Sequence, residues 1–468
     1  MITALRWLWR LVKTLVLTAF YATPLVGFWL ASSLTAYLRG PAWLAWSVGL
    51  AVFPVLPLLW ELRGSIKWRA RHRPTDERIF TLAQRLSMRT FVVGLAFLMG
   101  LLWMFPRAAF VSLSARGDWM LDGHTGPSAD RARRALFAAA DGLEWLYRAS
   151  RKNPYEALIE NSVDRVALLF PDPDASTPLW PWRTQGPHPL VTQIPAAEET
   201  SLESAARWIA HREPDPFLRV KALHDYVADR VAYDAASLYA GRYPPQDAAT
   251  VFRTRLGVCA GYANLLAAMG TAASETIVVV SGDARSPDGK ELTGGGHAWN
   301  AAKVQGKWYL IDATWDSGHV SQEKGFTKAY STEYLFPPPR TMALDHFPRE
   351  AQWQLLGQPL SQGDFLRQPM LHPSFYAEGM ELIAPQRAQN EARGHASILI
   401  KNPRQRWLFA TAERDGREVG RSEATRSGTA PLDCPLPGPG TYHVSIFSND
   451  QRDGTYHGVG KLEFVVAN

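Results

Sequence analysis

The chain has 468 residues, of which 46% are hydrophobic and 20% charged, and its formal net charge is +6. This length predicts about three domains of roughly 150 residues each. The positive charge forms no concentrated stripe after the N-terminal region, which argues against a nucleic-acid partner. Only two cysteines occur, so the sequence offers no disulfide framework.

The first 113 residues are rich in Leu, Trp, Val and Phe and predict a membrane region. Three apolar stretches, at about 11–38, 41–60 and 91–113, each have the roughly 20 residues that a transmembrane helix needs. Two further apolar stretches argue against reading the first one as a cleaved signal peptide. An alternative is that the stretches around Pro24 and around Pro54 and Pro57 are re-entrant, which would invert the orientation.

Basic residues predict the orientation of this region. The segment between the second and third stretches carries eight Lys and Arg residues against three Asp and Glu, and Arg6, Arg10 and Lys13 lie before the first. Because such segments remain in the cytoplasm, the third crossing would export everything that follows. The pattern suits an integral protein of a bacterial inner membrane, with its later domains on the outer, periplasmic side.

Residues 114–198 predict a helical stalk and a linker. Ser128 is a candidate N-cap for a helix that runs to about Arg151. An extended linker follows, since prolines recur at 171, 173, 178, 181, 187, 189 and 195. The Asp215-Pro216 pair then begins a helix with Val220, Leu223 and Val227 on its inward face. We take 199–358 as the core domain.

Cys259 is the first candidate for chemistry. Gly257 interrupts the preceding chain, and the run after Cys259 has helical spacing, which places the cysteine at the start of a helix. A free thiol ionises only near pH 8.5. The positive end of a helix dipole favours the thiolate, and the unpaired amides there can hold an oxyanion.

His297 and Asp312 lie on the two arms of a predicted hairpin, HAWNAAKV and KWYLIDATW, joined by Gln305-Gly306. This register places Trp299 opposite Asp312. His297 and Asp312 then lie diagonally on one face, with Cα atoms roughly 7–8 Å apart. We expect the glycines at 294–296 to let the chain pass close to another element, with the Cys259 helix as the first candidate.

Taken singly, each of these residues has a structural explanation, because a lone cysteine is more often a small buried hydrophobe than a nucleophile. Together with their motifs, RLGVCAGYANLL, HAWN and WYLIDATW, they resemble the transglutaminase-like superfamily, relatives of papain-like cysteine proteases. The segment DHFPREAQWQLLGQPLSQGDFLRQP resembles the kyphoscoliosis-peptidase and cytokinesis-protein branch. The resemblance covers roughly 200–385, and GTAASETIVVVSG departs from the usual Gly-Ile-Pro step.

The resemblance implies roles for the three residues. Cys259 would be the nucleophile, His297 the general base and acid, and Asp312 the group that orients the imidazole. Tyr233 or Tyr243 is the candidate second oxyanion donor, and Trp299 the candidate wall of a substrate groove, with packing as the alternative for a tryptophan on a hairpin. We expect no metal and no cofactor, and no calcium-binding loop of animal transglutaminases is carried over.

After Pro385 the pattern changes to short alternating strands: ASILIKN, WLFATAER, TYHVSIFSN and KLEFVVAN. Such strands, separated by Gly, Pro, Asn and Asp, predict a β-sandwich-like domain, which we place at 359–468. No titratable cluster occurs in it. Its expected role is therefore to bind or position, with envelope proteins as candidate partners.

The sequence thus predicts an α+β papain/transglutaminase-like core, preceded by three transmembrane helices (1–113) and followed by an all-β domain. Two functions remain open. One is a membrane-anchored cysteine peptidase, amidase or protein-glutamine acyltransferase, which forms a Cys259 thioester with a protein or peptide substrate. The other is a catalytically silent scaffold of the same fold that binds envelope proteins.

Overall fold

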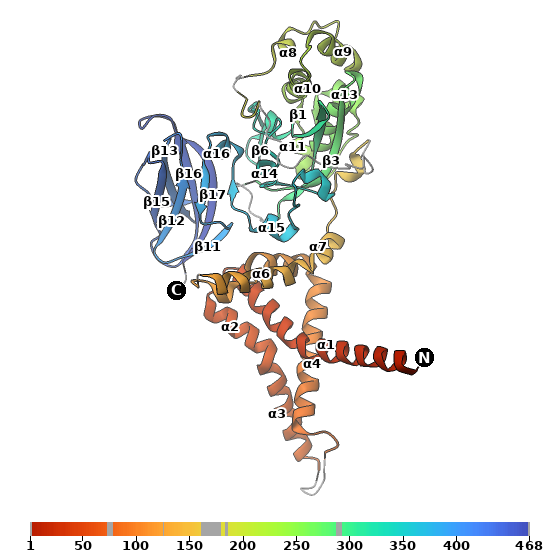
Figure 1. Ribbon diagram of the computed structural model, residues 1–468, viewed down its shortest axis with the longest axis vertical. Coiled ribbons are helices and arrows are strands. Elements are labelled where there is room, and N and C mark those ends of the chain that lie inside the picture. The colour runs from red at the N-terminus through yellow and green to blue at the C-terminus, as the bar shows by residue number, and fades with distance from the viewer. Residues whose placement is uncertain are drawn as a thin grey trace.

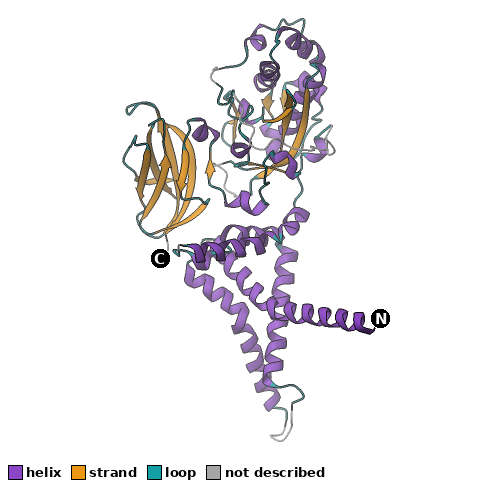
Figure 2. Cartoon of the chain, in the orientation of Figure 1, coloured by secondary structure: helices purple, strands orange, loops and turns teal. Residues whose placement is uncertain are grey.

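The computed structural model describes residues 2–72, 78–124, 126–160, 179–182, 186–286 and 293–466. A helical N-terminal region comes first, a core of mixed helices and strands follows, and the chain ends in a strand-rich region (Figures 1 and 2). The core and the strand-rich region lie side by side at one end of the long N-terminal helices, and the turn between α3 and α4 lies at the other end (Figure 1).

Three helices are long and apolar enough to cross a membrane, over 12–37, 42–69 and 82–104. Their elements are α1 (Ile2–Tyr37), α2 (Ala42–Leu50), the kinked η1 (Ala51–Val55), in which Phe53 has extended backbone, α3 (Leu56–Arg69) and α4 (Leu82–Met104). Large apolar side chains such as Trp43 and Trp103 are exposed along them, which marks a surface that meets something other than water.

The predicted limits of the second and third stretches were wrong. The second helix continues past residue 60 to Arg69, and α4 begins at Leu82 rather than near residue 91. The cause is a capping box, in which Thr81 and Gln84 bond reciprocally and start the helix among polar residues. Charged residues of the two helices form an ion pair, in which Glu61 of α3 lies 2.7 Å from Arg89 of α4.

The helix predicted from Ser128 to Arg151 is divided in two. Gly126 precedes α6 (Pro127–Asp141), whose first residue is a proline, and Ser128 makes no cap hydrogen bond. Pro127 accounts for this start, since proline is preorganised for the first helical position. The chain breaks after Asp141 and continues in α7 (Glu144–Ser150). The neighbouring elements are α5 (Pro106–Arg116), η2 (Trp119–Leu121) and η3 (Glu156–Leu158).

The predicted proline-rich linker lies largely outside the described residues, which omit 161–178 and 183–185. At its end the short helix α8 (Pro189–Gln193) begins with a proline. The helix predicted at Asp215-Pro216 is present as α10 (Pro216–Arg230). The Asp215 side chain caps it by accepting from Phe217 and Leu218.

The core is a four-stranded antiparallel sheet in the order β5-β4-β3-β8, and helix α13 packs on β3 and β4. Its strands are β3 (Thr276–Ala284), β4 (Gly295–Val304), β5 (Lys307–Ile311) and β8 (His346–Pro348). Its helices are α9 (Leu202–Arg212), α11 (Ala235–Ala240), α12 (Ala248–Thr254), α13 (Cys259–Ala272), η4 (Trp315–Ser317), α14 (Pro339–Met342) and η5 (Ala351–Gln354). Two small pairs complete it: β1 (Ala232–Tyr233) with β2 (Leu256–Gly257), and β6 (Gly318–Ser321) with β7 (Gly325–Lys328).

Two facing sheets form the strand-rich C-terminal region, with orders β10-β12-β15 and β11-β17-β16-β13-β14. Its elements are α15 (Gln362–Arg367), β9 (Met370–Leu371), α16 (Pro373–Ala377), β10 (Glu381–Ala384), β11 (Gln389–Ala392), β12 (His395–Lys401), β13 (Trp407–Arg414), β14 (Arg417–Arg421), β15 (Thr429–Pro435), β16 (Gly440–Asn449) and β17 (His457–Val466). Alternate side chains such as Ile398 and Ile400 are buried between the sheets. Cys434 is a free, buried residue of strand β15.

A buried aspartate joins the N-terminal region to the strand-rich region. Asp118, whose side chain is fully buried, accepts from Arg387 at 2.6 Å and from Arg133 at 3.2 Å. Arg116 reaches Glu391 at 2.9 Å beside it. Because a buried carboxylate is stable only when it is paired, this contact fixes where the strand-rich region sits on the helices.

We therefore predict that Asp118→Ala lowers the free energy of unfolding by about 2–3 kcal/mol, since it removes two hydrogen bonds between charged groups. Asp130→Ala is the matched control. Asp130 pairs with the same Arg133 but its side chain is 54% exposed, so its loss should cost about 0–1 kcal/mol. Thermal unfolding of the full chain in detergent measures both, and equal effects would contradict the assignment.

Candidate active site

Cys259 is the first residue of α13, as the sequence predicts. Val258 precedes the helix, and its N–H donates to Gln246 Oε1 at 2.8 Å. Of the first amides of this helix, that of Gly261 donates back to the carbonyl of Val258 at 2.8 Å, whereas the amides before it have no acceptor within an α-helix. The Cys259 side chain is fully buried.

His297 and Asp312 meet through the predicted hairpin. Val304 pairs with Lys307 and Asn300 with Ile311, which is the expected register, and Gln305 and Gly306 have the positive φ values, 50° and 83°, of the turn. His297 Nε2 donates to Asp312 Oδ2 at 2.6 Å. Nδ1 is then the ring nitrogen left for the thiol.

The three groups interact electrostatically. Burial alone would lower the pKa of His297, but Asp312 and then Cys259 outweigh it and raise this pKa to about 9. Burial would raise the pKa of Asp312, but His297 and then His346 hold it well below its usual range. The geometry therefore favours a protonated His297 imidazole beside an ionised Asp312 carboxylate.

His346 is a site residue that the sequence analysis missed. Its Nε2 donates to Asp312 Oδ2 at 3.0 Å, and its Nδ1 lies 2.6 Å from Asp345 Oδ1. It is 1% exposed. The only available signal was the Asp-His pair in the segment DHFP, because no periodicity connects β8 with a hairpin more than 30 residues earlier.

The second carboxylate oxygen is also used. Asp312 Oδ1 accepts from the backbone amides of Thr314 at 2.8 Å and Trp315 at 3.1 Å. Since four donors surround one buried carboxylate, Asp312 can neither rotate nor take up a proton without losing hydrogen bonds. His297, Asp312 and His346 also place three ligand-type atoms within 4.8 Å of one another. The direct 2.6 Å bond between His297 and Asp312 explains this closeness without a metal ion.

The two candidate tyrosines lie near the thiol, together with a third. Tyr233 pairs with Gly257, two residues before Cys259, and the rings of Tyr243 and Tyr155 are 5.3 Å apart. Burial raises the pKa of Tyr233 and of Tyr155 above the usual range, and the charge of Cys259 raises both further. Tyr155 precedes the core domain, which is why the sequence analysis did not single it out.

Trp299 lies in the core. It is 1% exposed and packs with Val280 and Leu310 behind His297. Of the two interpretations that the sequence left open for Trp299, packing therefore holds and the substrate groove does not. The Trp315 ring lies 4.6 Å from the ring of His346.

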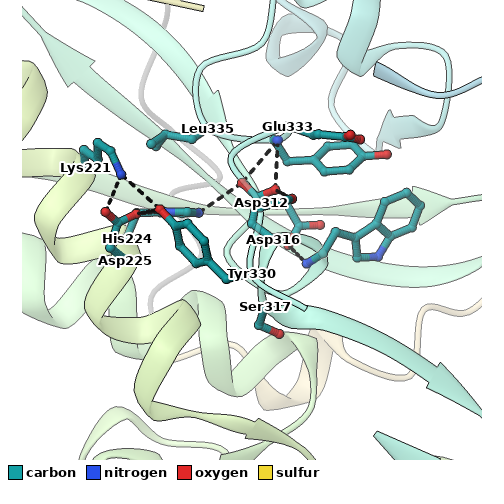
Figure 3. Close-up of polar contacts among 12 residues, drawn as sticks. Lys221, His224, Asp225, Asp312, Asp316, Ser317, Tyr330, Glu333 and Leu335 are labelled. Atoms are coloured by element: carbon teal, nitrogen blue, oxygen red, sulfur yellow. Dashed lines mark hydrogen bonds and ion pairs between the residues drawn. The ribbon is translucent and has the colours of Figure 1, made fainter. Parts of the chain in front are cut away.

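A second buried ionic cluster, composed of Lys221, His224, Asp225, Asp316 and Tyr330, lies next to Asp312 (Figure 3). His224 lies 2.9 Å from Asp225 and 3.2 Å from Asp316, and both carboxylates are fully buried. Tyr330 donates to Asp225 at 2.7 Å. Asp316 therefore anchors helix α10 to the turn that carries Asp312.

Comparison with known proteins gives a family match for part of the chain. Residues 203–313 match the family described as the transglutaminase-like superfamily. The kyphoscoliosis peptidases of Mus musculus and Homo sapiens are 31% and 30% identical over 242 residues, which are 50% of this chain and 36% of each relative. The chain thus matches about a third of the length of these relatives. Hillarin of Drosophila melanogaster is 25% identical over 95 residues, which are 18% of this chain and 12% of Hillarin.

Two solved structures share local similarity. One is described as a TGase, with 22% identity and a TM-score of 0.21 over 31% of this chain and 35% of that chain. The other is described as a putative cysteine protease from Cytophaga hutchinsonii, with 23% identity and a TM-score of 0.21 over 30% of this chain and 44% of that chain.

The fold and the family match define a mixed α/β protein with a papain/transglutaminase-like core. Residues 203–313 match the transglutaminase-like superfamily, and the chain shares sequence with the kyphoscoliosis peptidases.

The buried histidines predict a dependence of stability on pH. Aspartate partners, together with Cys259 at His297, outweigh burial and raise the pKa of His224, His297 and His346 each to about 9, whereas an unfolded histidine titrates near 6.5. Between about pH 6.5 and 9 the folded state therefore binds up to three more protons than the unfolded state, so the free energy of unfolding falls as pH rises.

Thermal unfolding at pH 6, 7.5 and 9 should show a progressive fall in Tm. His346→Gln removes one of the three titrating groups, and its Tm should fall less steeply over the same range. A Tm that is constant from pH 6 to 9 would show that these imidazoles are neutral in the folded protein.

Proposed function

We propose that the protein is a membrane-anchored cysteine enzyme that attacks an amide through Cys259. The observation that carries the proposal is the 2.6 Å bond between His297 and Asp312, together with the influence of Cys259 on the pKa of the same imidazole. A nucleophile, a base and an orienting group in one chain of contacts form the minimal apparatus of thiol catalysis.

In the first half-reaction the Cys259 sulfur attacks the amide carbonyl carbon, and a C–S bond forms. The oxyanion would be held by amides of the first turn of α13, with Tyr233 or Tyr243 as the further donor. His297 then gives its proton to the leaving nitrogen, the C–N bond breaks, and a thioester and a free amine result. Asp312 keeps the imidazole in place and stabilises its positive charge.

In the second half-reaction an acceptor attacks the thioester, loses a proton to His297 and releases the Cys259 thiolate. Water as the acceptor gives a peptidase or an amidase, and an amine gives an acyltransferase. Both outcomes use the same residues, so the proposal covers both. The substrate class is a protein or peptide amide.

The alternative is a catalytically silent scaffold that binds envelope proteins, with the strand-rich region as a candidate binding part. The complete burial of Cys259 is the observation that favours it, because buried cysteines are commonly inert. The pH profile of thiol alkylation separates the two.

We predict that iodoacetamide alkylates Cys259 of the full chain in detergent at a rate that is already near its plateau below pH 7. The reason is that the His297 imidazolium stabilises the thiolate. In His297→Ala the alkylation rate should instead rise around pH 8.5, because the ordinary pKa of a cysteine thiol is about 8.5. Mass spectrometry of the Cys259 peptide measures the rate, and the shape of the profile, not its absolute height, is diagnostic. Identical profiles would favour the scaffold.

The proposed location is an inner membrane, with the core and the strand-rich region outside the cytoplasm. The basic residues around the α3–α4 turn support this orientation, and this turn lies at the opposite end of the helices from the core (Figure 1).

A membrane-impermeant maleimide tests the orientation in intact spheroplasts. Ile79→Cys, at a position that is 93% exposed near the α3–α4 turn, should stay unlabelled until the membrane is lysed. Gln451→Cys, at an exposed position of the strand-rich region, should label at once. Both native cysteines are buried, so the background is low, and the reverse pattern would show the inverted orientation.

A further inference from the structure

Residues 151–160, here called the covering segment, close the site from the outside. They follow α7 and lie before the 203–313 family match. Tyr155 belongs to the same buried cluster as Cys259, with Leu158 and Ile159 packed against that cluster. Cys259 is fully buried and His297 is 6% exposed, so an amide cannot reach the thiol while these side chains are in place.

The covering segment is fixed to the sheet on one side. The Asn153 side chain donates to the backbone carbonyls of Gly282 and His297, both at 3.0 Å. Arg151 pairs with Asp283 at 2.9 Å. The first residues of the covering segment are therefore bonded to strands β3 and β4 beside His297.

On the other side it is fixed to the helix of Cys259. The Asn264 side chain of α13 donates to the carbonyl of Leu158 at 2.8 Å and accepts from the amide of Glu160 at 3.2 Å. These contacts use backbone groups two residues apart, at the end of the short helix η3 and directly after it, and they do not depend on the side chain of Leu158. Glu160 in turn accepts from the amide of Ala248 at 3.1 Å.

The glycines before His297 fit the covering segment closely. A Cβ at Gly296 would lie 2.5 Å from Asn153 Oδ1 and 2.9 Å from Pro154 Cδ, whereas a Cβ at Gly295 would meet nothing within 4 Å. The close neighbour that we expected for these glycines is thus the covering segment, not the Cys259 helix. The absence of a side chain at position 296 is what lets the cover close.

We propose that the surface over Cys259 is a binding site for a polypeptide segment, and that residues 151–160 occupy it in cis and block the thiol until they are displaced. The inference rests on the proposed function, since it takes this surface as the route of the substrate. It gives the substrate as a polypeptide whose backbone Asn264 contacts, rather than a small free amide.

The test is the absolute rate of Cys259 alkylation by iodoacetamide at pH 7 in the full chain in detergent. The wild type should react at least tenfold more slowly than the double variant Asn153→Ala/Tyr155→Ala. This variant loses the two hydrogen bonds of Asn153 to the sheet and the Tyr155 ring that packs in the cluster of Cys259. Cys434, buried in the strand-rich region, is an internal control, because general unfolding would expose both cysteines and displacement of the cover only one.

Two glycine variants leave the covering segment itself intact. Gly296→Ala should accelerate labelling of Cys259, since its methyl group pushes Asn153 and Pro154 away, and Gly295→Ala should leave the rate at the wild-type value. The proposal is overturned if the wild-type Cys259 reacts as fast as in the double variant, or if the two glycine variants behave alike.

A synthetic peptide of residues 151–160 tests the polypeptide site. A tethered segment has an effective concentration in the millimolar range, so the peptide at several millimolar should slow labelling of the double variant, and a peptide of the reversed sequence should not. Absence of protection would overturn the polypeptide site. If the variants react rapidly but with a pH profile that His297→Ala does not change, the cover stands and the proposed enzyme function fails.

Discussion

The buried carboxylate of Asp312 is the constraint on which the site depends. A fully buried anion is costly unless donors surround it, and Asp312 has four: two imidazoles and two backbone amides. These donors come from strand β4, strand β8 and the turn after β5. The sheet order β5-β4-β3-β8 brings the two histidines to one carboxylate. The sheet and the site are therefore stabilised by the same contacts.

The five-residue turn from Asp312 to Asp316 joins two such clusters. At its start Asp312 lies between His297 and His346, and at its end Asp316 contacts His224, which also lies next to Asp225. Charges of opposite sign alternate through both clusters, so each buried group faces a counter-charge. This is why polar residues can occupy the centre of the core without water, and why helix α10 is held at a fixed distance from the hairpin.

Local rules predicted much of this arrangement. The Gln305-Gly306 turn determines the register of the hairpin, and register alone brings His297 near Asp312; Gly257 and the helical run after Cys259 placed the thiol at a helix start. His346 and Tyr155 escaped prediction because their contacts with the site join distant segments and follow no period in the sequence. The substrate-groove interpretation of Trp299 was not met for a different reason. Strand alternation gives the face of a residue, but it does not say whether that face meets solvent or a second layer.

The covering segment extends this coupling to the N-terminal helices. It leaves α7, whose Tyr147 ring packs 5.2 Å from Phe110 of α5, and Arg107 of α5 donates to the carbonyl of Ser150 at 2.7 Å. Helix α5 directly continues α4, one of the three apolar helices. On the proposed function, the segment that blocks the thiol thus has its first end fixed to the membrane side and its body fixed to the catalytic core. Displacing it requires breaking contacts with the core, while α7 can stay packed on α5. A substrate that competes for Asn264 and for the carbonyls of Gly282 and His297 would supply the same hydrogen bonds in return, so substrate binding and removal of the cover become one exchange.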